Sequence, residues 1–235
     1  TGRRVANRLP AILIPLLLFA SLVGWAYASP VGSSPDDPMH LPSIWWDLGG
    51  RGGLCKVPAY DPDILLVPEA LVTAPCFAFV AEQSGACWNP RDLELVEPNQ
   101  INTSGDYPPI FYGVMSIFAS ADIQASVIAM RIFNAILCIG VFTAIFWLLP
   151  HRIRSAAVIP MIATAVPLGL FIIPSTNPSP WAYMSAGIVW AAPYGALNST
   201  GPRVWWLWGF AILGTVMGAG ARGDAAADGV LRLVL

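Results

Sequence analysis

Long apolar runs that carry almost no charge alternate with short polar links along most of this chain. The first run, Leu9–Ala28, has the roughly 20 residues that a helix needs to cross the hydrocarbon core of a bilayer. Four more follow, at about Ala125–Leu149, Ser155–Pro174, Trp181–Ser199 and Val204–Ala221. Because a helix satisfies its own backbone hydrogen bonds in lipid, the pattern predicts an all-α polytopic membrane protein with five spans.

The first run also has a competing interpretation, a cleaved signal peptide. Arg3, Arg4 and Arg8 precede it, as basic residues precede a signal sequence. The apolar stretch is too long for a typical signal core, however, and Ala26-Tyr27-Ala28 matches a cleavage site only weakly. We therefore favour an uncleaved helix.

Composition supports a membrane protein and excludes other classes. Charged residues make up 11% of the 235 residues and hydrophobic residues 56%, whereas a soluble domain carries about 25% charge. Disorder is excluded by the high hydrophobicity. Because the net charge is −2 and the chain has a single Lys, we expect no nucleic-acid partner and expect membrane lipid instead. The chain begins at Thr1 and ends at Leu235 in an apolar run, so we expect an N-terminal fragment of a longer protein.

Basic residues predict the orientation of the spans. They occur in the tail before residue 9, in the link that holds His151, Arg152 and Arg154, and at Arg203. These are alternate segments, and the positive-inside rule predicts that they are cytoplasmic. The segment 29–124 and the link Ser175–Pro180 would then lie outside.

The predicted outside segment, 29–124, is rich in Pro, Gly, Asn and Trp, which predicts a large loop structured by turns. Near its end, Tyr107-Pro108-Pro109 opens an apolar stretch that is short for a span. We predict an interfacial helix near 108–121, with Tyr107, Phe111 and Tyr112 at the membrane surface. The alternative is that this stretch begins one long kinked span.

Three of the four Cys residues, Cys55, Cys76 and Cys87, fall in this loop. A disulfide is plausible in an oxidising compartment. The Cys76–Cys87 pairing closes a short loop and is our first choice, but the sequence leaves all three pairings open. A metal site made of these Cys is disfavoured because no CxxC spacing accompanies them.

The sharpest chemical feature is the carboxylate pair Asp36-Asp37, just after the first span, with His40 three residues on. One acid could be the general base for an acceptor hydroxyl, or the pair could hold a divalent metal ion, the only cofactor we consider. The alternative is a Pro-flanked turn with an Asp that caps the next helix. Trp45, Trp46 and Trp88 could stack on a sugar, although loop Trp side chains also simply pack.

Several short motifs, in this order and spacing, carry a family resemblance. They are Ser29-Pro30, Gly32, Ser34-Pro35-Asp36-Asp37, His40, Tyr107-Pro108-Pro109, Met130-Arg131-Ile132-Phe133-Asn134-Ala135, Thr176-Asn177-Pro178-Ser179 and Ala221-Arg222-Gly223-Asp224-Ala225. The chain resembles the N-terminal half of GT-C-type membrane glycosyltransferases. It resembles more closely the actinobacterial membrane proteins of domain-of-unknown-function family 2142. That family often has Asp-Glu where this chain has Asp36-Asp37, which conserves the charge.

The resemblance implies a GT-C-like helix bundle in the cytoplasmic membrane of a bacterium. It implies transfer of a sugar from a polyprenyl-phosphate donor to a glycan or lipid acceptor of the cell envelope on the outer face. Asp36 or Asp37 would activate the acceptor hydroxyl. A basic residue must hold the donor phosphate, because the leaving group is an anion. Arg222 is the best-placed candidate, with Lys56, Arg91 and Arg131 as alternatives.

The remaining candidate substrate-binding residues are His40, Tyr107, Asn177 and Asp224. Asn177 could bind a sugar or phosphate, or only form an Asx turn, which we favour. Asp224 could pair with Arg222. Arg131, near the end of a span, could be functional or could extend to the interface.

Two other functions stay open. A transporter or flippase for an envelope lipid would place charged or broken-helix features near mid-membrane. The middles of the spans contain no acids here, which favours chemistry at the surface. A non-catalytic scaffold predicts that Asp36 and Asp37 are dispensable.

Overall fold

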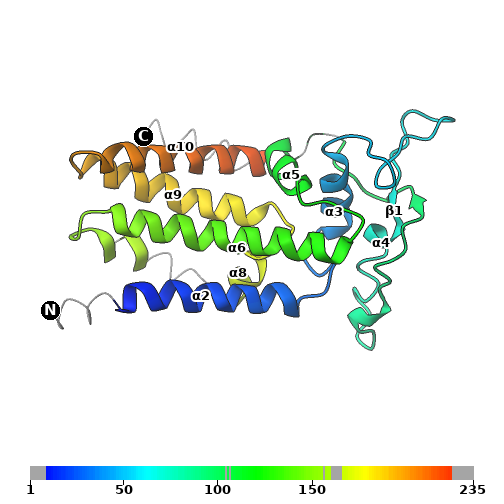
Figure 1. Ribbon diagram of the computed structural model, residues 1–235, viewed down its shortest axis with the longest axis horizontal. Helices are drawn as coiled ribbons and strands as arrows, with labels where there is room; N and C mark the ends of the chain where they lie inside the picture. The colour runs from blue at the N-terminus through cyan, green and yellow to red at the C-terminus, as the bar shows by residue number, and fades with distance from the viewer. Residues whose placement is uncertain (1–8, 104, 106, 156, 160–165, 224–235) are drawn as a thin grey trace.

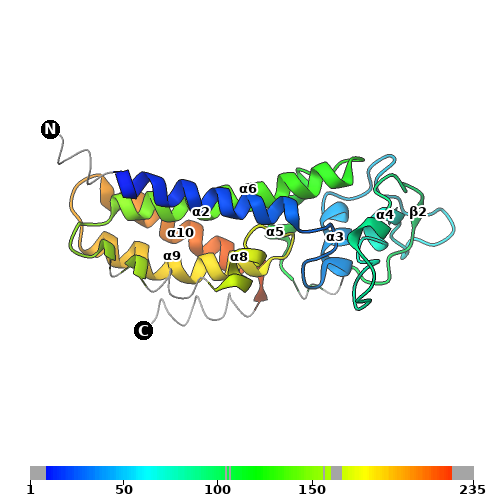
Figure 2. The same ribbon diagram turned by 90° about the horizontal axis from the view of Figure 1, so that it is seen from below.

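Four long helices lie side by side and give the molecule its elongated shape (Figures 1 and 2). They are α2 (Leu9–Ala28), α6 (Ile123–Leu148), α9 (Ser179–Leu197) and α10 (Arg203–Ala221). This arrangement comes from a computed structural model, which describes residues 9–103, 105, 107–155, 157–159 and 166–223. Within those residues, α2, α6 and α10 are long and apolar enough to cross a membrane.

The hydrophobic pattern therefore located three of the predicted spans to within two residues at either end. The predicted span Trp181–Ser199 corresponds to α9, which has 19 residues but is not among the helices that meet the hydropathy criterion. The predicted span Ser155–Pro174 lies partly outside the described residues. Its described part includes the short helix α8 (Pro167–Ile172).

Small residues let α9 and α10 approach closely. A Cβ atom built on Gly214 of α10 would lie 2.7 Å from Ile188 Cγ2 and 3.3 Å from Val189 Cγ2, both on α9. In lipid, where apolar burial drives helix association only weakly, such close backbone packing holds helices together. Glycine at position 214 is therefore part of the α9–α10 interface.

Residues 29–122 connect α2 to α6 and gather at one end of the bundle, which we call the loop end (Figure 1). Within them lie α3 (Asp37–Trp46), β1 (Val67–Pro68), α4 (Glu69–Val72), the 3-10 helix η1 (Gly85–Cys87), β2 (Leu95–Val96) and α5 (Pro109–Ser116). β1 and β2 pair antiparallel, with Val67 opposite Val96. α5 ends six residues before the first turn of α6 is capped at Asp122, so it is a separate short helix.

The aromatic residues of α5 correct one expectation. Phe111 and Tyr112 are buried, with exposed fractions of 0% and 2%, so the prediction that they face the membrane interface is wrong. Phe111 instead packs edge-on against Trp181 of α9, with ring centroids 5.3 Å apart. α5 thus joins the loop end to the bundle.

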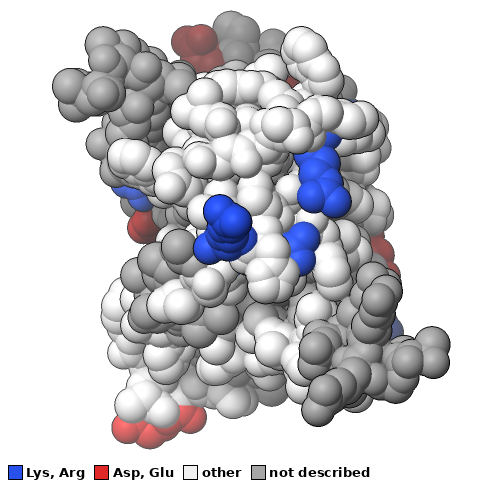
Figure 3. Space-filling model, turned by 90° about the vertical axis from the view of Figure 1, so that its left-hand side faces the viewer, with Lys and Arg blue, Asp and Glu red and all other residues white. Residues whose placement is uncertain are grey.

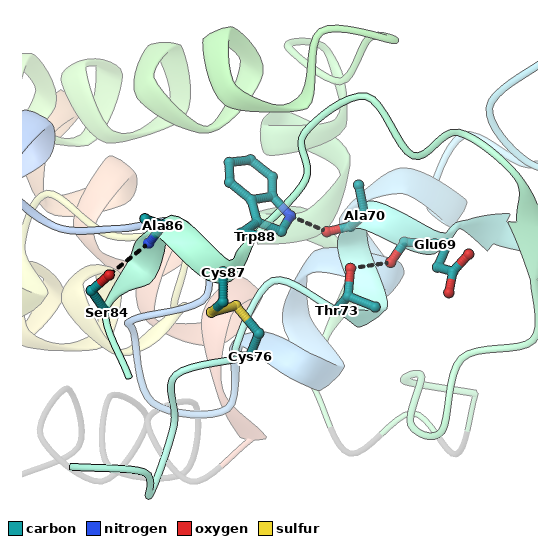
Figure 4. The surroundings of a disulfide bond; sticks show 8 residues. All are labelled: Glu69, Ala70, Thr73, Cys76, Ser84, Ala86, Cys87 and Trp88. Atoms are coloured by element: carbon teal, nitrogen blue, oxygen red, sulfur yellow. Dashed lines mark hydrogen bonds between the residues drawn. A yellow bond between two sulfur atoms is a disulfide. The ribbon is translucent and has the colours of Figure 1, made fainter. Parts of the chain in front are cut away.

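A disulfide joins Cys76 to Cys87 in this segment, the pairing that was our first choice (Figure 4). Next to it, the indole of Trp88 donates to the carbonyl of Ala70 at 2.8 Å. The bond and the indole together fasten the η1 loop to α4. Cys55 is buried and is not disulfide-bonded.

The turn after α2 requires a glycine. Gly32 has φ +82°, and a Cβ atom there would lie 2.6 Å from the backbone carbon of Ala74. Any larger residue would be strained by this backbone conformation and would also clash with the backbone near the disulfide. The turn therefore packs directly on the disulfide loop and fixes the start of α3.

The opposite end of the bundle presents basic side chains (Figure 3). Arg152, Arg154 and Arg203 lie there, at or near helix ends. The guanidinium of Arg154 donates to the carbonyls of Leu149 and Trp147, both at 2.9 Å. These three Arg lie at the short links of the bundle, whereas the other basic residues that the structure describes lie in or near the loop end: Arg51, Lys56, Arg91, Arg131 and Arg222.

Candidate functional site

The motifs from the sequence converge where α2 and α6 meet the loop end, and Arg131 of α6 holds them together. Its side chain is 1% exposed. It donates to the carbonyls of Ala26 and Pro30, at 3.1 and 2.9 Å, and to that of Ser29. These carbonyls include the negative end of the α2 dipole, where a cation is favourable. Arg131 therefore ties the turn after α2 to α6.

One turn further along α6, Asn134 binds a second segment. Its Nδ2 donates to the carbonyl of Ser175 at 2.8 Å, and its Oδ1 accepts from the indole of Trp181 at 2.9 Å. Asn134 is fully buried and both of its polar atoms are bonded. The polar pair on α6 thus positions two loops that are about 145 residues apart in the chain.

Asn177 then joins those two loops to each other. Its Oδ1 accepts from the backbone of Ser179 at 2.8 Å, which is an Asx turn, and its Nδ2 donates to the carbonyl of Pro35 at 2.8 Å. The side chain is 4% exposed. Both side-chain hydrogen bonds of Asn177 go to backbone groups, so Asn177 positions the segment that carries the two acids.

Asp37 is buried, and each of its two carboxylate oxygens accepts a hydrogen bond. Its Oδ1 accepts from the hydroxyl of Thr176 at 2.6 Å and its Oδ2 from the backbone N–H of Ser34 at 3.0 Å. Burial raises the pKa of Asp37 from 3.8 to about 6, against the opposing effects of the Thr176 bond and the charge of Arg131. The side chain is 0% exposed, so Asp37 has no free face toward a substrate.

Asp36 differs from its neighbour in every respect. It is exposed, and its carboxylate makes no hydrogen bond with the described residues. Its backbone is left-handed, with φ 59°, a conformation that Asp tolerates better than most residues. The backbone carbonyl accepts from His40 N at 2.9 Å and so begins α3, while the side chain stays free.

His40 lies one turn into α3 and is fully buried. Its Nδ1 is 2.9 Å from the hydroxyl of Tyr112, and its Nε2 has no partner among the described residues. Burial lowers the pKa of His40 to about 4, with Asp36 raising it and Arg222 lowering it. His40 is therefore neutral at physiological pH and lies in the field of both charges.

Arg222 is the basic residue that approaches His40 through the ring of Tyr107. It follows α10 directly, and its Nη1 donates to the hydroxyl of Ser179 at 3.2 Å. The guanidinium lies 5.9 Å from the ring centroid of Tyr107, and that ring in turn meets His40 edge-on at 5.0 Å. Asp36, His40, Tyr107, Tyr112 and Arg222, which we call the loop-end cluster, thus combine an exposed acid and a half-buried cation with aromatic rings.

This arrangement suits proton abstraction and anion binding better than metal binding. Both oxygens of Asp37 are already bonded, and Asp36 stands apart from it. No group of three or more His, Cys, Asp or Glu among the described residues could hold a metal ion. The two acids therefore do not fit the divalent-ion site that the sequence suggested as an option.

The other predicted residues are distributed as follows. Lys56 pairs through its backbone with Leu66, and its exposed side chain makes no hydrogen bond or ion pair with the described residues of the loop-end cluster. Asp224 lies outside the described residues. Sequence reasoning missed the site roles of three residues: it named Asn134 and Thr176 only as members of motifs and Tyr112 only as an interface aromatic. A lone amide within an apolar span was a further signal for Asn134.

A family model described as a predicted membrane protein (DUF2142) matches residues 19–234 of the chain. No curated protein and no solved structure matches it. The match covers both loops of the site and the residues that bind them.

Proposed function

The chain belongs to the DUF2142 family of predicted membrane proteins, and from this premise we propose that it is a membrane glycosyltransferase. It would transfer a sugar from a polyprenyl-phosphate donor to a cell-envelope acceptor on the outer face of a bacterial cytoplasmic membrane. The loop end would face outward, because the short links at the other end carry Arg152, Arg154 and Arg203, and the positive-inside rule counts basic residues in short links rather than in long loops (Figure 3).

One observation carries this proposal: the exposed acid Asp36 begins the helical turn that ends at the buried His40, and the guanidinium of Arg222 lies 5.9 Å from the Tyr107 ring that meets His40 at 5.0 Å. Asp36 and Arg222 shift the pKa of His40 in opposite directions, as charges within reach of one site do. Group transfer from a phosphate donor needs both functions, a base for the acceptor and a cation for the leaving anion.

In the proposed reaction, the carboxylate of Asp36 takes the proton from the acceptor hydroxyl. The hydroxyl oxygen forms a bond to the anomeric carbon of the donor sugar. The bond from that carbon to the phosphate oxygen breaks, and its electron pair leaves with the polyprenyl phosphate. Arg222 binds this anion, with Ser179 and Tyr107 holding the guanidinium.

Asp37, Arg131 and Asn177 would be positioning residues in this scheme. Their polar atoms are bonded to backbone carbonyls, a backbone N–H and a buried hydroxyl. They hold the turn that presents Asp36. The transporter alternative receives less support, because Arg131 and Asn134 near this end of α6 are bonded to protein carbonyls.

The test is sugar transfer from a radiolabelled polyprenyl-phosphate donor in membranes that carry the protein. We expect Asp36→Asn to lower kcat about 10²-fold or more, the usual worth of a general base. Asp63→Asn is the matched control, since Asp63 is an exposed acid of the same segment whose carboxylate makes no hydrogen bond with the described residues. Arg222→Ala should lower kcat/KM for the donor and Arg222→Lys should restore part of it. Undiminished transfer by Asp36→Asn at equal protein level refutes the proposal.

A further inference from the structure

A cavity of about 290 Å³ lies beside the loop-end cluster, between α3, α5 and the chain at 101–103. Its size is near the lower end of the range for small-molecule sites. The residues that decide its chemistry are Trp46, Asp47, Asn102, Thr103, Tyr107 and Tyr112. Two of them, Tyr107 and Tyr112, also belong to the cluster.

The walls of this cavity are held by bonds that leave a few polar groups free. The indole of Trp46 donates to the carbonyl of Leu66 at 3.1 Å, and the amide of Asn102 bonds the backbone of Tyr107. The carboxylate of Asp47, by contrast, has no hydrogen bond to any residue that the structure describes. Partial burial of the carboxylate raises the pKa of Asp47. The cavity therefore offers fixed aromatic rings and an available carboxylate.

These groups select among ligand classes. A phosphate is disfavoured, because the nearest charge in the wall is that of Asp47. A purely apolar ligand would bury that carboxylate without a partner, which is costly. A sugar ring satisfies both features: its C–H face packs on an aromatic ring and its hydroxyls donate to a carboxylate.

The cavity also lies next to the proposed chemistry. Tyr112, in its wall, bonds Nδ1 of His40 at 2.9 Å. The ring centroid of Tyr107, in the same wall, lies 5.0 Å from that of His40 and 5.9 Å from the guanidinium carbon of Arg222. A ligand in the cavity is thus separated from His40 and Arg222 by these two tyrosine rings.

We propose that this cavity binds a sugar residue of the acceptor glycan, with Trp46 and Tyr107 as the stacking surface and Asp47 as the hydrogen-bond acceptor. Its role as an acceptor subsite rests on the proposed function. Binding of a carbohydrate to the cavity does not, and it can be measured without any transfer.

The experiment uses the protein in lipid nanodiscs and four soluble probes: maltotriose, mannotriose, cellotriose and chitotriose. Binding is measured by saturation-transfer NMR and calorimetry. At least one trisaccharide should bind, and Asp47→Asn should weaken its binding about tenfold, because a charge-assisted hydrogen bond becomes a neutral one. Asp63→Asn should bind as the parent protein does. Asp47 makes no bond whose loss would unfold the protein, and a thermal melt of each variant checks this.

The outcomes separate the two proposals. No binding by any probe, or equal affinity of Asp47→Asn and the parent, overturns the cavity proposal. Tetramethylammonium serves as a fifth probe, and its binding without that of any sugar also overturns the cavity proposal, since the rings and carboxylate would then form a cation site. Asp47-dependent sugar binding without any transfer would refute the proposed function and leave the cavity proposal standing. If both hold, Asp47→Asn should raise the acceptor KM and leave kcat unchanged.

Discussion

Asp37 and His40, three positions apart in the first turn of α3 and both buried, should make opposite contributions to stability as the pH changes. Burial raises the pKa of Asp37 from 3.8 to about 6 and lowers that of His40 from 6.5 to about 4. In both cases the folded protein favours the neutral form. Between pH 4 and 6 the folded state therefore keeps a proton on Asp37, and the unfolded state keeps one on His40 instead.

The sign follows for each group separately. The Asp37 contribution is fully present below pH 3.8 and is lost as the pH rises through about 6. The His40 contribution is fully present above pH 6.5 and is lost as the pH falls through about 4. Each pKa unit is worth about 1.4 kcal/mol, so each contribution amounts to about 3 kcal/mol. The two nearly cancel in the parent protein.

Single substitutions should reveal how the free energy of unfolding depends on pH for each group alone. Asp37→Asn leaves only the histidine contribution, so its free energy of unfolding relative to the parent should rise by about 2–3 kcal/mol from pH 4 to 6.5. His40→Asn should fall relative to the parent by a similar amount. At about 2–4 °C per kcal/mol for a chain of this size, the changes in melting temperature are roughly 5–10 °C.

The assay is thermal unfolding in detergent micelles, followed by tryptophan fluorescence at several pH values. Trp45 is fully buried, so its emission reports the loss of the loop-end core. Taking each variant as a difference from the parent cancels the other titrating groups. Two difference curves that slope in the same direction, or that are both flat, would refute the reasoning about buried neutral groups.

Two further predictions concern the helix contacts and the buried hydrogen bonds of the bundle. Gly214→Ala should destabilise the protein by about 1–3 kcal/mol, because its Cβ would lie 2.7 Å from Ile188. The control, Gly209→Ala on the same helix, meets open space and should be neutral or stabilising by up to about 1 kcal/mol. Equal melting temperatures for the two variants would contradict the close contact. Asn134→Leu should cost about 1–3 kcal/mol for each group left unpaired, among them the indole of Trp181, and an unchanged unfolding midpoint in denaturant would show that these bonds do not hold the loops.

The spans were predictable because lipid imposes a length and a hydropathy on a helix. Leu9–Ala28 was predicted to its terminal residues, and α6 and α10 to within two. The short helix α5 followed from Tyr107-Pro108-Pro109, since proline favours the first turn of a helix. The sequence did not predict that the aromatic face of α5 is buried, because this burial depends on the position of Trp181 in the fold.

The sequence could not show which of the two acids is exposed and which is buried. Asp36 and Asp37 are identical in type and adjacent in the chain, and both lie at the start of a helix. What separates them is the hydroxyl of Thr176, which lies 139 residues further along and bonds only Asp37. The site roles of Asn134 and Thr176 were missed for the same reason, since single polar residues near apolar runs acquire a role only through tertiary contacts.

The central claim is that the exposed acid performs the chemistry and the buried one holds it in place. Its most direct test is the sugar-transfer rate per folded molecule of Asp36→Asn and of Asp37→Asn, with the folded fraction taken from thermal melts at the assay temperature. We predict that Asp36→Asn is as stable as the parent but inactive, and that Asp37→Asn is altered in stability but active once folded. An active Asp36→Asn, or a folded and inactive Asp37→Asn, would contradict the claim.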